Sequence, residues 1–180
     1  MRSTPEALIA RLDLRPHPEG GWYRELHRSP GQVHRAGDGR QRAGLTVIAF
    51  LLAEGQLSRW HQVAGADEVW HHAGGDPLDL WRLPPQGGTA ERLWLGPLAA
   101  TDAAGDTTAD TAGDAAAAAG DPGAGPLQIV PALWWQAARS RGRWSLVHCC
   151  VGPGFAFEDF RLMADLPPAE RPAGADPTLL

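Results

Sequence analysis

The chain has 180 residues, of which 43% are hydrophobic, enough to bury one globular core. Its formal net charge is −5, its basic residues are all arginines, and it has no basic run, which argues against a Schiff-base lysine enzyme and against a nucleic-acid-binding protein. Its two cysteines, Cys149 and Cys150, are adjacent, so we expect no disulfide framework and a reducing, cytoplasmic location. The start lacks a signal-peptide pattern, and the longest apolar run, 45–53, is too short to span a bilayer, so we expect no membrane contact.

The first predicted element is a short helix over residues 4–14. Thr4 is a suitable N-cap, and a proline follows it at the first helical position. Residues 15–21 contain two prolines and paired glycines, which cannot continue a helix.

Most of the remaining chain has the pattern of short strands separated by Gly, Pro and Asp turns. Residues 22–27 alternate so that Tyr23 and Glu25 share one face, and residues 29–39 are typical of a loop. Further strands are predicted at 43–52, 59–63, 68–73, 78–83, 90–95, 127–130, 134–140 and 143–151, with a last aromatic strand or turn over 152–162. Because only one helix is predicted and strand–helix alternation is absent, the pattern favours an all-β sandwich or barrel.

Two segments differ from this pattern in composition. Residues 99–126 are almost wholly Ala, Asp, Gly, Thr and Pro, with aspartates at intervals of four that would stack like charges along a helix. We therefore expect a flexible loop insert there, rather than a separate domain or a calcium loop. Residues 167–180 have the composition of an exposed C-terminal tail, which leaves residues 1–166 as a single domain.

Candidate functional residues are concentrated in residues 55–76, which contain His61, Glu68, His71 and His72. Strand alternation places Glu68 and His72 on one face and His71 on the other. If the strands on either side of the intervening turn form a hairpin, His61 and Glu68 can meet across it.

A carboxylate beside an imidazole raises the imidazole pKa and selects one tautomer, as a general base or a pair of metal ligands requires. A single histidine in such a strand would more simply be structural or exposed. Four titratable candidates so close together favour a functional site.

Several further residues are candidates for the same pocket. Tyr23, the one tyrosine of the chain, is a candidate proton donor, with a packing role as the alternative. Arg59 could hold a carboxylate or phosphate as a bidentate fork, or lie at the rim in solvent. Glu25 is either a pocket acid or part of a salt bridge, and Trp134 and Gln136 share a face that could line the cavity.

Other conspicuous residues have simpler interpretations. Cys149 and Cys150 are expected to be small buried residues, because no activating group is evident near them. His17 is expected to be a loop residue. The aromatic residues of 155–160 are expected to form core or a dimer interface.

These residues also resemble a known family. Gly55, His61, Glu68 and Gly75 fall on the first cupin motif, in which Val63 replaces the second histidine, and a weaker second motif lies over 125–140 with its second glycine, histidine and asparagine replaced. Three further segments, 16–25, 130–138 and 153–160, resemble the poorly characterised single-domain cupin-five family. The resemblance extends over residues 8–163, interrupted by the insert.

The resemblance implies a double-stranded β-helix, the cupin jelly-roll barrel, with a cavity at one mouth, and commonly a homodimer. The chain also resembles, more distantly, the metal-free dTDP-sugar epimerases. Because Val63 cannot ligate a metal and two protein ligands hold one poorly, we expect no tightly bound metal and no other cofactor. A weakly held divalent ion on His61, Glu68, His72 and Gln136 is the alternative.

Three functions remain open from the sequence. The first is an isomerase or epimerase acting on a small anionic or sugar-like molecule, with His61 as base, Glu68 orienting it, Tyr23 or His72 returning the proton, and Arg59, Glu25, Trp70, Trp134 and Gln136 binding the substrate. The second is a non-catalytic binding or sensing module in which Trp60, Trp70, Trp134 and Trp144 stack on the ligand. The third is a metal-dependent enzyme.

Overall fold

The computed structural model describes residues 3–97 and 124–180, and most of the predicted insert therefore lies outside the described residues. The predicted N-terminal helix is α1 (Pro5–Leu12), which begins after Thr4, whose hydroxyl accepts a hydrogen bond from the N–H of Ala7. It ends at Asp13, which adopts a left-handed conformation with φ of 52°. Among the described residues, no helix has the length and apolarity needed to cross a bilayer.

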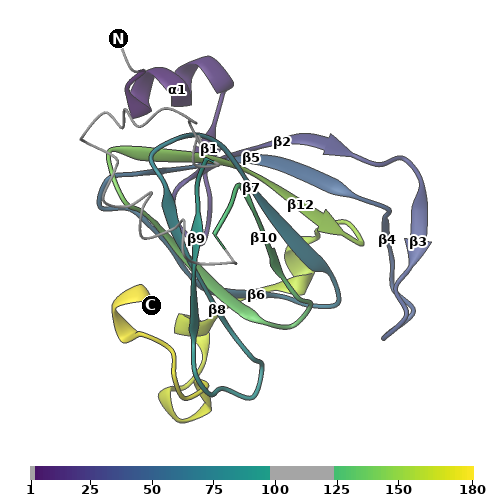
Figure 1. Cartoon of the computed structure of the whole chain (residues 1–180). Coiled ribbons are helices and arrows are strands. Elements are labelled where there is room, and N and C mark those ends of the chain that lie inside the picture. Colours follow the sequence, from purple (N-terminus) through teal and green to yellow (C-terminus); the bar gives the residue numbers. More distant parts are fainter. Residues whose placement is uncertain (1–2, 98–123) are drawn as a thin grey trace, which may run out of the picture.

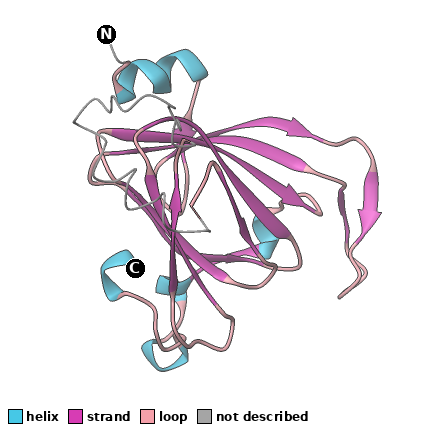
Figure 2. Cartoon of the chain, in the orientation of Figure 1, coloured by secondary structure: helices cyan, strands magenta, loops and turns pink. Residues whose placement is uncertain are grey.

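Two antiparallel sheets face each other and enclose the interior of a barrel (Figures 1 and 2). The six-stranded sheet has the order β1 (Arg15–Pro16), β2 (Trp22–Arg28), β5 (Thr46–Ala53), β12 (Trp144–Gly152), β7 (Asp67–Gly75), β10 (Leu127–Val130). The five-stranded sheet has the order β13 (Phe160–Leu162), β6 (Leu57–Val63), β11 (Trp135–Ser140), β8 (Leu78–Leu83), β9 (Glu91–Leu95). This arrangement confirms the predicted all-β double-stranded β-helix.

The predicted loop over 29–39 contains a regular element. β3 (Gln32–His34) pairs with β4 (Gln41–Ala43), and this hairpin projects to one side of the barrel (Figure 1). The last aromatic segment divides into a turn of 3-10 helix, η1 (Phe157–Asp159), and the short strand β13.

The hairpin predicted between the two histidine-bearing strands is wrong. β6 pairs with β11 and β13 in one sheet, whereas β7 pairs with β12 and β10 in the other. The turn after β6 therefore crosses from one sheet to the opposite one. His61 and Glu68 consequently project toward each other from facing sheets rather than lying side by side on neighbouring strands.

Alternation along each strand divides the apolar residues between the barrel interior and its outer faces. Phe50 and Leu52 pack inside, whereas Leu51 packs on the outside against Leu8 of α1. This double coverage explains why β5 is apolar on both faces.

The C-terminal tail is not fully exposed as predicted, because its end packs on the outside of the five-stranded sheet. After η2 (Met163–Asp165) and η3 (Pro168–Glu170), the chain ends in η4 (Pro177–Leu179), where Leu179 is only 1% exposed. Leu179 joins a core cluster with Trp60, whose indole N–H donates to the carbonyl oxygen of Asp176 at 2.9 Å. The sequence pattern of this segment is dominated by Pro and Ala and does not reveal that single apolar anchor.

Candidate functional site

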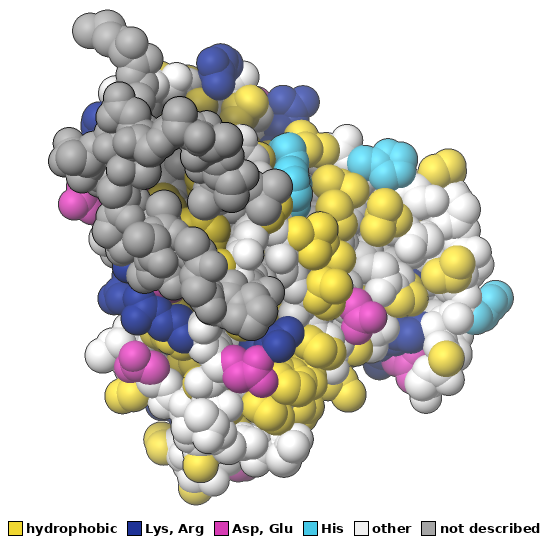
Figure 3. Space-filling view, viewed as in Figure 1, with side chains coloured by type: hydrophobic (Ala, Val, Ile, Leu, Met, Phe, Trp, Pro, Cys, Tyr) yellow, Lys and Arg dark blue, Asp and Glu magenta, His cyan; other side chains and the backbone are white. Residues whose placement is uncertain are grey.

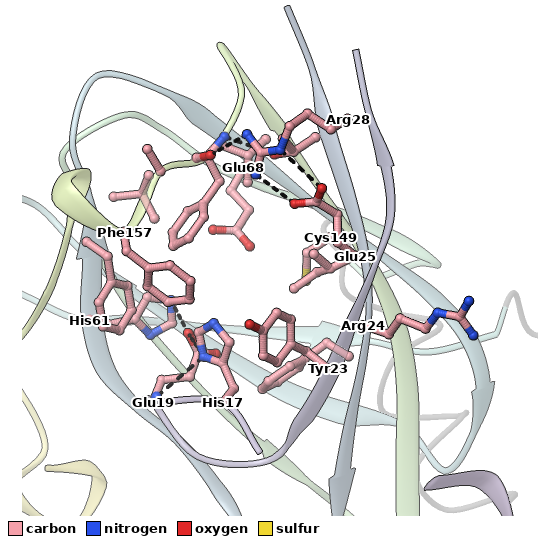
Figure 4. Close-up of a pocket in the computed structure, with 18 of the residues that line it drawn as sticks. His17, Glu19, Tyr23, Arg24, Glu25, Arg28, His61, Glu68, Cys149 and Phe157 are labelled. Atoms are coloured by element: carbon pink, nitrogen blue, oxygen red, sulfur yellow. Dashed lines mark hydrogen bonds and ion pairs between the residues drawn. The ribbon is translucent and has the colours of Figure 1, made fainter. Parts of the chain in front are cut away.

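A cavity of about 460 Å³ lies between the two sheets at one end of the barrel. Its buried inner end is polar, and its outer part carries phenylalanine rings and exposed charged residues. Figure 4 shows His61, Glu19 and His17 grouped at one side, with the carboxyl group of Glu68 and the hydroxyl group of Tyr23 also pointing into the cavity.

The loop between β1 and β2 brings Glu19 into the barrel. Gly20 has φ of 113°, and a Cβ atom there would collide with the carbonyl oxygen of Leu57, so the backbone can approach β6 only without a side chain. The backbone N–H of Arg59 donates to the carbonyl oxygen of Glu19 at 2.9 Å, and the Arg59 guanidinium donates to the carbonyl oxygens of Glu19 and Pro18. Arg59 therefore anchors this loop and does not line the cavity.

The acidic partner of His61 is Glu19, and not Glu68 as the sequence predicted. Glu19 Oε2 lies 3.3 Å from His61 Nε2 and 3.3 Å from His17 Nδ1. Its other oxygen accepts a hydrogen bond of 2.7 Å from the buried hydroxyl of Ser58. The carboxylate thus has three polar partners and is itself buried.

Burial of Glu19 would raise its pKa, but the charges of His61 and His17 and the hydrogen bonds from His17 and Ser58 outweigh it and hold the pKa below its usual value. Glu19 is therefore ionised at neutral pH. It supplies a fixed negative charge at the inner end of the cavity.

The hydrogen-bond partners of His61 determine the tautomer of its ring. Nδ1 lies 2.8 Å from the carbonyl oxygen of Arg59, which can only accept, so Nδ1 carries a hydrogen. Nε2 is then the nitrogen that faces the carboxylate of Glu19. The pair can hold one proton between Nε2 and Oε2, as a general base requires.

Glu68, on the facing sheet, is held in a different environment. The indole N–H of Trp70 donates to Gln136 Oε1 at 2.9 Å, which turns the amide so that Nε2 donates to Glu68 Oε2 at 2.6 Å. Cys149 also hydrogen-bonds to Glu68. Burial raises the pKa of Glu68, and the negative charge of Glu19 adds to this effect, against the opposing influences of His61, Gln136 and Cys149.

Two buried carboxyl groups in one cavity thus have pKa values displaced in opposite directions. This separation is the arrangement by which one acid of a pair can act as base and the other as proton donor. Burial also raises the pKa of Cys149 well above its usual value, so its thiol is neutral.

Two other predicted site residues, Tyr23 and Glu25, also line the cavity. Tyr23 packs edge-on against His17 with a ring-centroid distance of 4.6 Å. Glu25 forms a two-pronged ion pair with Arg28, with distances of 3.1 and 2.7 Å.

The remaining predicted site residues lie outside the cavity. His72, four residues beyond Glu68 along β7, is displaced by about 13 Å at the usual strand rise, and its Nε2 lies 3.2 Å from the carbonyl oxygen of Asp76. Trp70 and Gln136 are buried behind Glu68 and position it. Trp134 packs against the interior core, with the guanidinium of Arg82 over its ring.

The sequence predictions missed the residues that complete the site. Glu19 and His17 could have been identified as candidates, because they lie in the segment 16–25, which carries part of the family resemblance. Four phenylalanines line the cavity, Phe50, Phe155, Phe157 and Phe160, and are hereafter called the aromatic wall. None of the four tryptophans proposed to stack on a ligand lines this cavity.

The donors do not fit the metal set that the cupin resemblance suggests. One ring nitrogen of His61 faces a backbone carbonyl and the other faces Glu19. Gln136 Oε1 already accepts a hydrogen bond from Trp70, and His72 lies outside the cavity. Within residues 3–97 and 124–180, no three His, Cys, Asp or Glu side chains converge to hold a metal ion. The alternative set of His61, Glu68, His72 and Gln136 therefore does not assemble.

The family described as Cupin superfamily (DUF985) matches residues 6–163. The structure is similar to that of protein SO0799 from Shewanella oneidensis, with 30% identity, a TM-score of 0.67 and coverage of 89% of this chain and 85% of that one. It is also similar to a hypothetical protein from Leishmania major, with 27% identity, a TM-score of 0.68 and coverage of 88% and 86%. No protein with a curated description matches the sequence.

In fold alone, the chain also resembles the capsular polysaccharide assembling protein CapF from Staphylococcus aureus. The identity is 10%, the TM-score is 0.52, and the coverage is 83% of this chain and 33% of that one.

Proposed function

The chain belongs to the Cupin superfamily (DUF985) family, and from this and the geometry of its cavity we propose that it is a small-molecule enzyme of the isomerase or epimerase type. The observation that carries the proposal is the pairing of Glu19 with His61, opposite a second buried carboxyl group whose pKa is displaced the other way. Such a site can remove a proton from carbon on one side and return it on the other.

The reaction we propose begins with a substrate whose acidic C–H group lies next to a carbonyl group. The His61–Glu19 pair takes the proton, which is then held between Nε2 and Oε2, and Glu19 stabilises the imidazolium that forms. The electron pair of the broken C–H bond moves into the carbonyl, giving an enolate or enol whose oxygen accepts a hydrogen bond from the Tyr23 hydroxyl or from the Glu68 carboxyl group, whose raised pKa favours its protonated form. Delivery of a proton from Glu68 or Tyr23 to the opposite face of the same carbon gives the epimer, and delivery to the former carbonyl carbon gives the isomer.

Proton exchange with solvent tests this function. Phenylpyruvate and dihydroxyacetone phosphate, which both carry acidic C–H groups, are incubated in deuterium oxide with the enzyme and followed by NMR. We expect exchange faster than in buffer for at least one of them, and its loss in His61→Ala. Exchange that persists in that variant, or no acceleration with either probe, would overturn the proposal.

A second candidate function is non-catalytic binding of a small molecule. The observation that favours it is the aromatic wall, which offers contact area without reacting groups. Saturable binding without exchange, unaffected by Glu68→Gln, is the result that this function predicts.

We further propose that the chain forms a homodimer. Exposed apolar side chains occur on one face of the six-stranded sheet, among them Leu127 and Ile129 of its edge strand β10, and hydrophobic side chains also gather on the face drawn in Figure 3. Light scattering coupled to size-exclusion chromatography measures the mass, and a monomer at micromolar concentration would contradict the proposal.

A further inference from the structure

The two ends of the cavity differ in the ligand groups that they can accept. The inner end holds the ionised carboxylate of Glu19 and the buried carboxyl of Glu68. A ligand anion placed there would face at least one negative charge at close range in a site of low dielectric constant. The inner end therefore suits an uncharged carbonyl or hydroxyl group.

The middle of the cavity offers contact area but few hydrogen bonds. The aromatic wall is continuous: the ring of Phe155 packs edge-on against that of Phe157 at 5.1 Å, and Phe157 stacks on His17 at 6.0 Å. The Thr46 hydroxyl beside it already accepts a hydrogen bond from the backbone N–H of Phe155. A sugar ring needs polar partners around its edge, whereas a flat apolar body needs only this surface.

The exposure of Phe157 also indicates a ligand with an apolar body. It is 53% exposed although its ring packs against the wall and His17, so a large apolar face lies uncovered at the mouth. A ligand with an apolar body would cover that face on binding.

The mouth carries a guanidinium group that is held in one orientation. Arg28 donates from Nε and one terminal nitrogen to the two oxygens of Glu25, and from its other terminal nitrogen to the carbonyl oxygen of Phe155 at 3.0 Å. A guanidinium has five N–H groups, so two remain after these three bonds. The two bonds to Glu25 and the bond to the wall segment fix its plane before any ligand arrives (Figure 4).

We propose that the ligand of this cavity is a carboxylic acid with a compact apolar or aromatic body, whose carboxylate binds the remaining N–H groups of Arg28. Its body lies against the aromatic wall, and its carbonyl or hydroxyl group reaches the polar inner end. Only the carbonyl or hydroxyl group of this ligand rests on the proposed function. Its apolar body is assigned from the aromatic wall, and its carboxylate is assigned from Arg28.

Equilibrium binding of unreactive probes tests the ligand class by calorimetry. Hydrocinnamate, its neutral amide and gluconate are titrated separately into the full-length protein. We expect hydrocinnamate to bind about tenfold more tightly than its amide, the effect of one favourable charge contact of about 1.4 kcal/mol, and more tightly than gluconate. Gluconate binding as tightly as hydrocinnamate, equal binding of acid and amide, or no saturation by hydrocinnamate up to about 10 mM would overturn the assignment.

Two variants that break the same ion pair separate ligand binding from a structural role. Arg28→Gln should abolish the preference for the acid over the amide, whereas Glu25→Gln, which leaves the Arg28 charge uncompensated, should preserve or increase it. If the preference falls in both variants or in neither, Arg28 does not bind the carboxylate. Thermal melting of each variant checks that the fold is retained.

A matched pair of apolar variants tests the body of the ligand. Phe157→Ala should weaken acid and amide equally, while Leu26→Ala, at a side chain of almost the same exposure that does not line the cavity, should change neither. Equal effects of the two substitutions would contradict the placement of the ligand body.

The ligand class and the isomerase function can fail separately. Exchange of dihydroxyacetone phosphate together with failure of hydrocinnamate to bind would refute this ligand class and leave the isomerase function standing. Selective hydrocinnamate binding without any exchange would refute the isomerase function and leave this ligand class standing.

Discussion

The carboxylate of Glu19 and the imidazole of His61 come from distant parts of the chain and lie with Oε2 and Nε2 3.3 Å apart inside the barrel. His61 projects from β6, and Glu19 reaches it from the loop after β1, which is tied to the same strand by Arg59. Because the other nitrogen of His61 is occupied by a backbone carbonyl, the proton chemistry of this histidine depends on Glu19.

The first prediction concerns that dependence. Glu19→Gln removes the charge that stabilises the imidazolium, and we expect the rate of substrate-dependent deuterium exchange to fall about a hundredfold or more. The exposed acid Glu54, in the turn before β6, provides the control, because Glu54→Gln changes one charge far from His61. An unchanged rate in Glu19→Gln would show that His61 works without this partner.

The second prediction concerns the turn that carries Glu19. Gly20→Ala places a Cβ atom against the carbonyl oxygen of Leu57 at a φ of 113°, so it combines steric overlap with backbone strain. Gly88 has a similar φ of 128° but open space around it, so Gly88→Ala introduces the strain alone. We expect Gly20→Ala to cost more than Gly88→Ala in urea unfolding, by about 1–3 kcal/mol, and equal costs would contradict the close approach.

The third prediction follows from the raised pKa of Glu68. A carboxyl group whose pKa is higher in the folded than in the unfolded state favours folding at low pH and loses that contribution as pH rises through the folded value. Glu68→Gln cannot ionise, so the variant should gain stability relative to wild type as pH rises from about 4 through neutrality. Urea unfolding at several pH values measures this difference, and a gap that narrows with rising pH would contradict the burial effect.

The fourth prediction concerns the segment that carries the aromatic wall. Asp159 is buried between Arg42, whose Nε lies 2.7 Å from Oδ2, and Arg35, whose terminal nitrogen lies 3.1 Å from Oδ1. Asp159→Asn removes the buried carboxylate that the guanidiniums of Arg42 and Arg35 share, leaving Arg35 paired with Asp38 alone, and we expect a loss of about 3 kcal/mol in the free energy of unfolding. Asp165→Asn, at an exposed site nearby, should cost less than about 0.5 kcal/mol, and similar costs for both would refute the role of this cluster.

The fifth prediction tests the packing of the C-terminus. Leu179→Ala should destabilise the protein by about 2 kcal/mol, at the low end for a buried leucine, because a terminal segment can partly collapse into the space. Leu26→Ala removes a leucine that is 52% exposed and should be nearly neutral.

The sequence was sufficient for the features that depend on local pattern. Alternating apolar residues and turn signals predicted nearly all the strands, and the N-cap residue Thr4 predicted the helix start. Alternation also placed Glu68 on an inward face and His71 on the outer one, because the two-residue period of a strand is a local property.

What the sequence by itself determined was therefore the all-β barrel and the inward direction of His61 and Glu68, whereas the tertiary structure decided which groups meet. Strand pairing put β6 and β7 in opposite sheets, which separated His61 from the predicted hairpin partner and left room for Glu19 to enter from the loop after β1. The same long-range packing brought residues 155–160 to the cavity instead of to the core. Pairing between distant strands depends on the burial of the whole chain, so no local pattern records it.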